Sequence, residues 1–184
     1  MALTFEPYGG IDGLLLVEGP YFPDERGFFF EAFRADDWAK AGLPLLVQDN
    51  LSRSKKGVVR GLHYQVPPQA IGKLVRCSRG RIFDAVVDLR RKSPTYGKSA
   101  SLELDDSGNR MFWVPEGFAH GFCALSDSAD VTYKVTGYWA KAVDAGILWS
   151  DPALGISWPV SASQAIVTAK DAALPLLKDA GSPF

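Results

Sequence analysis

Short runs of β-branched and aromatic residues recur along the whole chain, and glycine, proline, aspartate or serine interrupts them every few residues. This pattern is typical of an antiparallel sandwich or barrel, in which many short strands are joined by tight turns. We therefore expect an all-β (mainly β) fold. The expected strands are Gly13–Val17, Phe28–Phe33, Leu45–Leu51, Val58–Gln65, Lys73–Ser78, Arg81–Leu89, Ser99–Leu104, Arg110–Val114, Phe118–Leu125 and Asp130–Thr136.

Helical patterns are confined to two short stretches. Asp36–Ala41 is followed by Gly42, a residue type that often ends helices. Asp171–Lys178 is the second stretch, although Pro175 would disturb its interior. The 184 residues, 47% of them apolar, suffice for one domain with a sizeable core. No interdomain linker is visible, and the Ser/Ala-rich stretch Ser157–Thr168 is expected to be a surface loop.

Charge and targeting patterns exclude some classes of partner. The formal net charge is −1, so no global basic field would attract nucleic acid. No basic residue precedes Arg26, and the early aliphatic run Leu14–Val17 is far too short to span a membrane. We expect neither a nucleic-acid nor a membrane partner. Cys77 and Cys123 are the only cysteines, which indicates a reducing compartment and a cytoplasmic location.

Three titratable side chains fall on apolar strand faces. The chain has two histidines, His63 and His120, and His120 alternates with Phe118 and Phe122. Tyr133 similarly alternates with two valines. One interpretation is that these are hydrogen-bonded core residues. The other is that they line an aromatic pocket inside a barrel.

The relation between Arg60 and His63 is left open by the pattern. Strict alternation puts the two side chains on opposite faces of a strand. Gly61 lies between them and could mark a bulge that redirects one of them. Basic residues are frequent around this segment, and a subset of them, arginines above all, could bind phosphate.

A series of ordered motifs resembles the dTDP-4-dehydrorhamnose 3,5-epimerase family. The matching segments extend from about Gly13 to Leu177 and so cover nearly the whole chain. They are Asp24–Glu31, Gln48–Asn50, Arg60–Gln65, Gly72–Cys77, Phe83–Arg90, Pro115–Phe122, Tyr133–Lys134, Ile147–Trp149 and Ala169–Asp171. The resemblance implies a double-stranded β-helix, that is, a jelly-roll barrel of the cupin type, with a few short helices over residues 1–184.

The resemblance also implies roles for individual residues. His63 would be the general base, oriented by Asp171. Tyr133 would be the proton donor on the opposite face of the sugar, and Lys73 would lie beside the oxygen on C4. The expected substrate-binding residues are Arg26, Phe28, Glu31, Gln48, Asn50, Arg60, His120, Tyr138, Asp144 and Lys170. Phe28 and Tyr138 look like the pair that stacks on thymine.

Partners and cofactors follow from the same resemblance. The expected ligand is a dTDP-sugar, and no cofactor is expected. Family members are homodimers with exchanged N-terminal strands, so Arg26, Phe28 and Glu31 would serve the partner's pocket. The family commonly has glutamate where this chain has Asp144, which shortens that side chain by one methylene. No metal is expected, because metal-binding cupins generally carry a His-x-His pair, whereas Tyr64 and Gln65 follow His63 here.

These residue types suit epimerisation beside a ketone. The C4 keto group makes the protons on C3 and C5 removable because an enolate forms. Histidine has a pKa near neutrality, as such a base needs, and a carboxylate fixes its tautomer. A lysine can stabilise the enolate oxygen, and a phenol can return a proton from the other side.

The sequence is also compatible with three alternative functions. One is an epimerase of a related dTDP-4-keto-6-deoxy sugar that acts at C3 only, although Tyr133 favours the double reaction. Another is a non-catalytic sugar-nucleotide binding cupin, which would not need a His, Asp, Lys and Tyr constellation. The last is a metal-dependent cupin oxygenase or isomerase.

Overall fold

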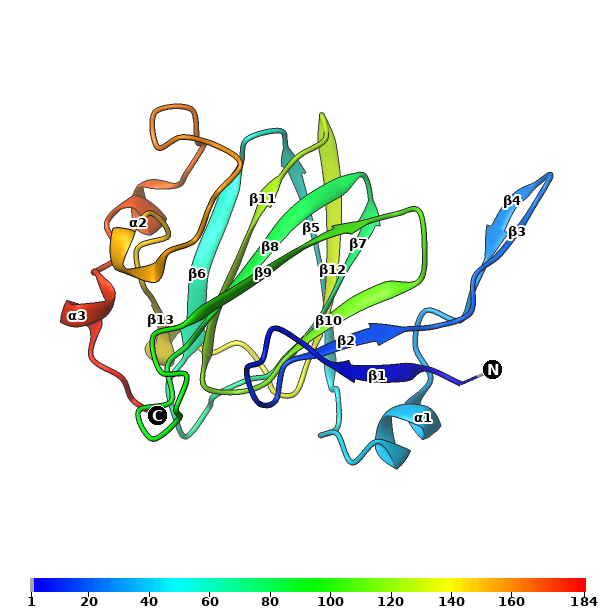
Figure 1. Cartoon of the computed structure of the whole chain (residues 1–184), viewed down its shortest axis with the longest axis horizontal. Coiled ribbons are helices and arrows are strands. Elements are labelled where there is room, and N and C mark those ends of the chain that lie inside the picture. Colours follow the sequence, from blue (N-terminus) through cyan, green and yellow to red (C-terminus); the bar gives the residue numbers. More distant parts are fainter. Residues whose placement is uncertain (1) are drawn as a thin grey trace.

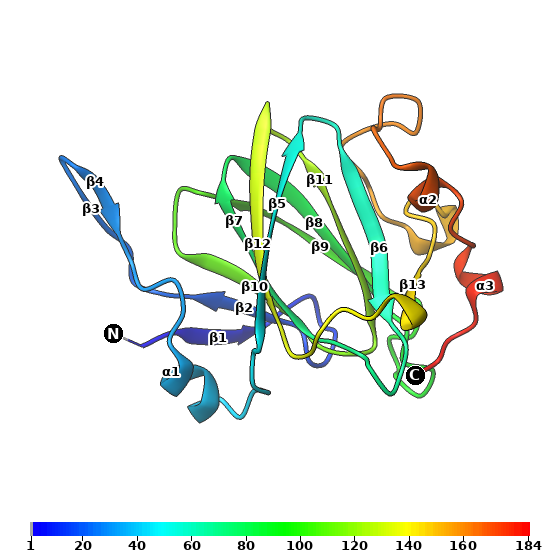
Figure 2. The ribbon, with the colours of Figure 1, turned by 180° about the vertical axis from the view of Figure 1, so that it is seen from behind.

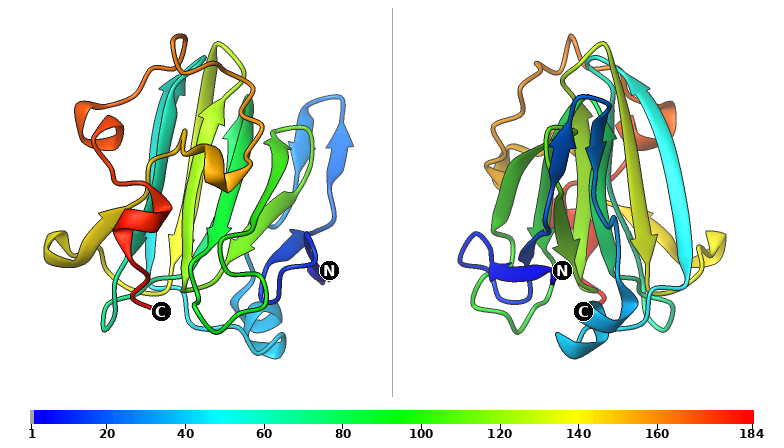
Figure 3. Two further views of the ribbon diagram at one scale, coloured as in Figure 1. Left: turned by 60° about the vertical axis from the view of Figure 1, so that its left-hand side comes forward. Right: turned by 90° about the vertical axis from the view of Figure 1, so that its right-hand side faces the viewer.

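The computed structural model describes residues 2–184 and contains two antiparallel sheets that face each other (Figure 1, Figure 3). The larger sheet has six strands in the order β1-β2-β10-β7-β12-β5. Its strands are β1 (Thr4–Pro7), β2 (Leu15–Glu18), β5 (Gln48–Lys55), β7 (Lys73–Arg79), β10 (Arg110–Val114) and β12 (Ser128–Val135).

The second sheet has five strands in the order β13-β6-β11-β8-β9. Its strands are β6 (Val59–Gln65), β8 (Arg81–Asp88), β9 (Ser99–Asp105), β11 (Phe118–Ala124) and β13 (Asp144–Gly146). Neighbours in this sheet, like those in the larger one, are antiparallel and largely non-consecutive in sequence, as in a jelly roll. The expected cupin-type barrel is confirmed.

The main core fills the space between the sheets. Alternation decides which side chains enter it: Ile82 and Val86 of β8 face the larger sheet and meet Val75, Phe112 and Val131. The opposite face of β8 is also buried, because the segment after β13 covers it.

The chain after β13 runs back over the outer face of the smaller sheet. Trp149 and Leu154 are buried there against Val87 and Leu89. The segment contains a 3₁₀ turn, η2 (Pro152–Leu154), and two short helices, α2 (Ala169–Ala172) and α3 (Leu177–Ala180). The single helix expected over residues 171–178 was wrong: the chain leaves the helical conformation around Pro175 and resumes it afterwards.

A longer helix, α1 (Ala35–Lys40), covers part of the outer face of the larger sheet (Figure 2). Its Trp38 is buried against Val17, Leu74 and Trp113. Gly42 follows with a φ of +73°, which explains why the helix ends there. The expected helix at this position is confirmed.

A hairpin of β3 (Phe22–Asp24) and β4 (Gly27–Phe29) projects from the barrel (Figure 1). The strand expected over residues 28–33 is therefore shorter and pairs only with its neighbour. The hairpin exposes large apolar side chains; Phe28 and Phe29 are 53% and 62% exposed. The local β-propensity predicted a strand in this region, but propensity does not determine which sheet a strand joins.

Other departures from the expected elements lie at the edges of the sheets. β1 and β13 were not foreseen because they are short and lack clear alternation. β5 begins at Gln48, and the preceding Leu45 is exposed. In the part of the chain that the structure describes, no helix is long and apolar enough to cross a membrane.

A buried carboxylate at the end of β8 anchors the loop to β9. Asp88 is inaccessible to solvent and accepts hydrogen bonds from Ser93 and Thr95, both at 2.7 Å. Arg90 donates to both of its oxygens, at 2.9 and 2.8 Å. Burial alone would raise the pKa of Asp88, but these hydrogen bonds outweigh it and lower the pKa from 3.8 to about 2.

We expect Asp88→Asn to lower the free energy of unfolding by about 2–3 kcal/mol, and Tm by about 5–10 °C, because Arg90 loses its charged partner. A carboxylate with a lowered pKa stabilises the fold above its unfolded pKa. The difference from wild type should therefore be full above about pH 4 and vanish as the pH falls towards 2. Denaturant unfolding across this range measures it.

Asp12→Asn is the matched control, because Asp12 also faces Arg90 but its side chain is fully exposed and 4.0 Å away. Its effect should stay within about 0.5 kcal/mol. Equal losses in both variants would contradict the role given to Asp88.

Candidate active site

The pairing of β6 with β11 determines whether the side chains of Arg60 and His63 point to the same face of the sheet. His120 pairs with His63, whereas Phe122 pairs with Arg60. The two pairs are therefore three residues apart along β6 but only two residues apart along β11, so β6 contains one extra residue. Because His120 and Phe122 share a face, this irregularity turns Arg60 and His63 to the same side. Both side chains line the inner mouth of the barrel.

Gly61 is needed at this irregularity for two reasons. Its φ is +126°, a conformation that side chains disfavour. A Cβ atom built on it would lie 2.6 Å from Cα of Gly121 on the neighbouring strand. Only two glycines facing each other allow the strands to approach so closely, and the directions of Arg60 and His63 depend on this approach.

His63 forms a hydrogen bond to a carboxylate from the C-terminal segment. Its Nε2 lies 2.7 Å from Oδ1 of Asp171, which is buried with 4% exposure. The other oxygen of Asp171 accepts from the Gly61 backbone N–H at 3.3 Å. Asp171 lies in the first turn of α2, whose N-cap Thr168 accepts from the Asp171 N–H at 3.1 Å. The cap thus fixes the carboxylate that orients the imidazole.

Burial lowers the pKa of His63 below its ordinary value of 6.5, and the hydrogen bond to Asp171 opposes that shift. The imidazole is therefore neutral near pH 7, with Asp171 ready to stabilise a positive charge on it. This is the electrostatic setting of a general base.

Lys73 begins β7 and extends towards His63. Its Nζ donates to the backbone oxygen of His63 at 3.3 Å. Burial lowers the pKa of Lys73 from 10.5 to about 8, while Asp84 and Asp144 counteract the shift. A largely protonated ammonium therefore lies beside the imidazole, inside a partly dehydrated site where its charge acts strongly.

The second histidine has a carboxylate partner of its own. His120 Nε2 lies 3.0 and 3.1 Å from the two oxygens of Asp84, and both residues are buried. No sequence pattern singled out Asp84 as a partner of this histidine. The signal that could have identified its role is the presence of a carboxylate between two core residues, Ile82 and Val86.

Tyr133 lies across the cavity from His63, on β12, which is next to the edge strand β5 of the larger sheet. It pairs with Val75 of β7 and Asn50 of β5, and it packs against the main core. Burial raises the pKa of Tyr133 above 10.0, against the influence of Arg60. The phenol therefore keeps its proton at neutral pH.

Two adjoining cavities of about 300 and 310 Å³ occupy the barrel mouth. They form one continuous site, since His63, Lys73, Tyr133 and Lys170 line both. The structure brings ten of the sequence-predicted residues to these walls: Gln48, Asn50, Arg60, His63, Lys73, His120, Tyr133, Asp144, Lys170 and Asp171.

Four predicted residues do not line these cavities. Arg26, Phe28 and Glu31 belong to the projecting hairpin or follow it, on the side of the molecule away from α2 (Figure 1). In this chain Arg26 forms an ion pair with Asp24, with 2.6 Å between a guanidinium nitrogen and a carboxylate oxygen. Glu31 forms an ion pair with Arg34 at 3.1 Å. Tyr138 is 70% exposed near the rim, beside Trp139, which does line the site.

The polar walls are ordered by hydrogen bonds within the chain. Gln48 Nε2 donates to Asn50 at 2.8 Å, and Lys170 Nζ donates to Asp144 at 2.5 Å. Asp144 thus lies at the site despite its shorter side chain. Arg60 donates to the Ser54 hydroxyl at 2.9 Å, a neutral partner that leaves its charge uncompensated.

Several residues of the walls were not foreseen from the sequence. Ser52 continues the alternation of Gln48 and Asn50 along β5, so a period of two could have identified it. Trp139 and Thr168 lie in loops, where alternation gives no information.

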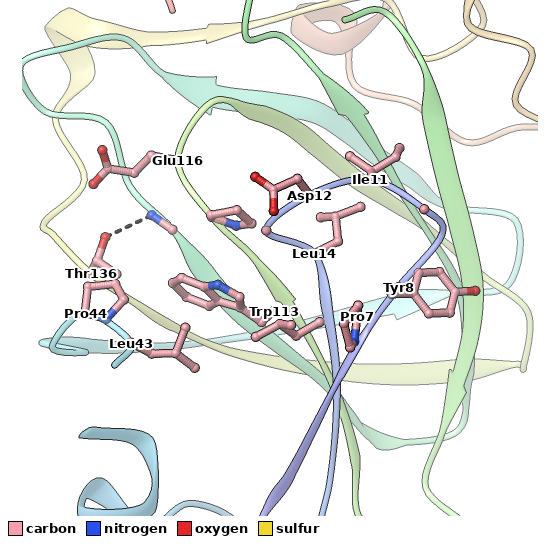
Figure 4. A pocket seen from close by; sticks show the side chains of 15 residues that line it. Pro7, Tyr8, Ile11, Asp12, Leu14, Leu43, Pro44, Trp113, Glu116 and Thr136 are labelled. Atoms are coloured by element: carbon pink, nitrogen blue, oxygen red, sulfur yellow. Dashed lines mark hydrogen bonds between the residues drawn. The ribbon is translucent and has the colours of Figure 1, made fainter. Parts of the chain in front are cut away.

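A larger cavity, of about 750 Å³, lies at the end of the barrel beyond Gly72 (Figure 4). Leu14, Leu43 and Trp113 give it an apolar lining, and its only carboxylates are Asp12 and Glu116. Among the described residues its lining includes no histidine, lysine or arginine, so it lacks the combination of an imidazole and a cation found in the smaller site.

The described residues contain no group of three or more His, Cys, Asp or Glu side chains that could hold a metal ion. His63 and His120 instead each pair with a single carboxylate.

Comparison with known proteins identifies the family. The profile of the family described as dTDP-4-dehydrorhamnose 3,5-epimerase matches residues 9–179. The enzyme of that name from Shigella flexneri is 51% identical over 152 residues, which is 82% of this chain and 84% of that protein. A dTDP-4-dehydrorhamnose 3-epimerase from Streptomyces niveus is 44% identical over 82% of this chain and 73% of its own length.

A solved structure agrees closely with the fold. The dTDP-6-deoxy-D-glucose-3,5-epimerase from Legionella pneumophila, in complex with dTDP-4-keto-L-rhamnose, superposes with a TM-score of 0.90. It is 44% identical and covers 96% of this chain and 94% of that one. The chain belongs to the dTDP-4-dehydrorhamnose 3,5-epimerase family.

Proposed function

We propose that this chain is an isomerase that epimerises C3 and C5 of dTDP-4-dehydro-6-deoxy-D-glucose, giving dTDP-4-dehydro-L-rhamnose for dTDP-L-rhamnose biosynthesis. The observation that carries the proposal is the neutral, carboxylate-oriented His63 beside the Lys73 ammonium, with the protonated Tyr133 across the same cavity.

The reaction uses these groups in turn. His63 removes the proton on the carbon beside the ketone, and Asp171 stabilises the imidazolium that forms. The electron pair moves to the C4 oxygen, where Lys73 stabilises the enolate more strongly than the ketone. Tyr133 then returns a proton from the other face, which inverts the carbon. A positioned base contributes about 10²–10⁴ in rate and a charge-stabilising donor about 10²–10³.

The remaining polar residues of the walls bind the nucleotide sugar. Arg60 and His120 face the cavity and suit the diphosphate. Gln48, Asn50, Asp144 and Lys170 offer hydrogen bonds to hydroxyl groups, and Tyr138 offers a face for the thymine. The complex of the Legionella relative with dTDP-4-keto-L-rhamnose supports this ligand class.

The functional unit in this proposal is a homodimer of one-domain chains. Arg26, Phe28 and Glu31 stand away from their own chain's cavity, on a hairpin whose aromatic side chains are exposed. Exposed apolar surface of this kind marks interaction sites. In the dimer the hairpin reaches the partner's pocket. The buried free thiols Cys77 and Cys123 support a cytoplasmic location.

A reaction at C3 alone is the second candidate, because the Streptomyces niveus relative carries the name of a 3-epimerase. The two reactions share the first proton transfer and differ in the second. Position-specific exchange separates them.

In deuterated water with dTDP-4-dehydro-6-deoxy-D-glucose, we expect NMR to show deuterium at both C3 and C5 of the product. His63→Asn should reduce exchange at both positions by about 10²–10⁴ while Tm stays within a few degrees of wild type. Exchange at C3 alone would favour the second candidate. Undiminished exchange in a folded His63→Asn protein would exclude this residue as the base.

The pH dependence of kcat/KM should be bell-shaped. His63 must be neutral, and its pKa is lowered, so the acid limb should lie below pH 6.5. Lys73 must be charged, so activity should fall above the Lys73 pKa of about 8. In Lys73→Arg the alkaline limb should move upward, since guanidinium stays protonated there. An alkaline limb unchanged in that variant would contradict the assignment to Lys73.

The dimer can be tested by mixing defective chains. His63→Asn and Arg26→Ala should each have low activity alone, but a heterodimer of the two contains one intact site. Random association should restore about a quarter of wild-type activity. The control pairs His63→Asn with Tyr133→Phe, which lie in one cavity and should not complement. Heterodimers without recovered activity would show that Arg26 does not serve the partner.

A further inference from the structure

Gln65 lies two residues after His63, at the end of β6, and is among the residues that line the same cavity. It is 3% exposed, and both ends of its amide are engaged. Nε2 donates to the backbone oxygen of Gln69 at 2.6 Å and to that of Tyr138 at 3.3 Å. Oε1 accepts from the backbone N–H of Ala140 at 2.7 Å. One buried side chain thus bonds to two loops.

Both loops belong to the wall of the active site. The first, residues 66–72, joins β6 to β7 and leads directly into Lys73. The second, residues 136–140, follows β12 and carries Tyr138 and Trp139. The loops are also joined at their base, where Gly72 donates to the Thr136 hydroxyl at 2.9 Å (Figure 4). Gln65 makes the corresponding connection at their outer part.

The aromatic residues of the second loop have little packing of their own. Tyr138 is 70% exposed and Trp139 is 59% exposed, although Trp139 lines the cavity together with His63 and Lys73. Their positions must therefore come from the backbone. Gln65 holds the carbonyl before Trp139 and the N–H after it, which fixes the peptide groups on both sides of that residue.

We propose that Gln65 is a positioning residue for the nucleotide sugar. It holds the Tyr138–Trp139 segment at the cavity rim, so that the aromatic faces are in place before the ligand binds. Preorganisation of this kind strengthens binding because less freedom is lost on association. The inference rests on the proposed function, since it names what positions the binding surface of that site.

The contacts of Gln65 predict which kinetic constants change. Its side chain makes no hydrogen bond to His63, Lys73 or Tyr133 among the bonds of residues 2–184. Its loss should therefore weaken binding and spare proton transfer. A residue important only for folding would instead lower the amount of active enzyme, and so kcat, at unchanged KM.

Gln65→Met preserves length and removes all three hydrogen bonds. We expect KM for the dTDP-sugar and Kd for dTDP, measured by calorimetry, to rise about tenfold, which is the equivalent of one hydrogen bond, about 1.4 kcal/mol. kcat should stay within about threefold of wild type. Gln69→Met is the matched control: that side chain is exposed, and only its backbone oxygen contacts Gln65. It should change neither constant.

A double-mutant cycle with Trp139→Ala tests whether Gln65 acts through this loop. If it does, Gln65→Met should change Kd less than about threefold in the Trp139→Ala background. Should Gln65→Met not fold, Gln65→Glu keeps the acceptor for Ala140, loses the donors, and should raise KM in the same direction.

Independent, additive effects in the cycle, or a fall in kcat with unchanged KM, would overturn the inference. Wild-type protein that neither binds dTDP nor exchanges deuterium would overturn the proposed function. Active wild type with an unchanged KM in Gln65→Met would overturn this inference alone.

Discussion

The close approach of Gly61 to Gly121 is the constraint on which the rest of the site depends. A side chain at either position would push β6 and β11 apart, because a Cβ on Gly61 would lie 2.6 Å from the Gly121 backbone. The contact lies at the place where β6 has one extra residue relative to β11, and this extra residue turns Arg60 to the same side as His63. Without it, strict alternation would put the phosphate-binding candidate and the base on opposite faces of the sheet.

His63, the proposed base, also depends on a segment more than one hundred residues away in sequence. Asp171 reaches His63 because the chain after β13 folds back over the smaller sheet, held by buried residues such as Trp149 and Leu154. The outer hydrophobic cluster therefore holds in place the segment whose carboxylate orients the imidazole of His63. In the same way the larger sheet, packed on the main core, holds Tyr133 opposite the imidazole.

The sequence predicted well what is encoded by alternation and poorly what is encoded by long-range pairing. The long central strands and the two faces of β8 follow from period-two patterns, and α1 follows from Gly42. The position of the β3–β4 hairpin, the break at Pro175 and the short strand β13 depend on contacts that no local pattern contains. For the site, the bulge at Gly61 could be suspected but not decided, and neither Asp84 nor Gln65 was recognised, because their importance lies in what they bond to.

A chain with a net charge of −1 must still attract an anionic substrate, and its ion pairs explain how. Several cationic side chains away from the cavity form ion pairs with carboxylates: Arg53 with Asp130, Arg90 with Asp88, and Lys134 with Asp49. None of the ion pairs within residues 2–184 involves Arg60 or Lys73, which bond to a hydroxyl and to backbone oxygens instead. Neutral acceptors orient these two cations and leave their charges available to an anionic ligand in the cavity. The neutral partners of Arg60 and Lys73 therefore make the site suitable for a nucleoside diphosphate sugar.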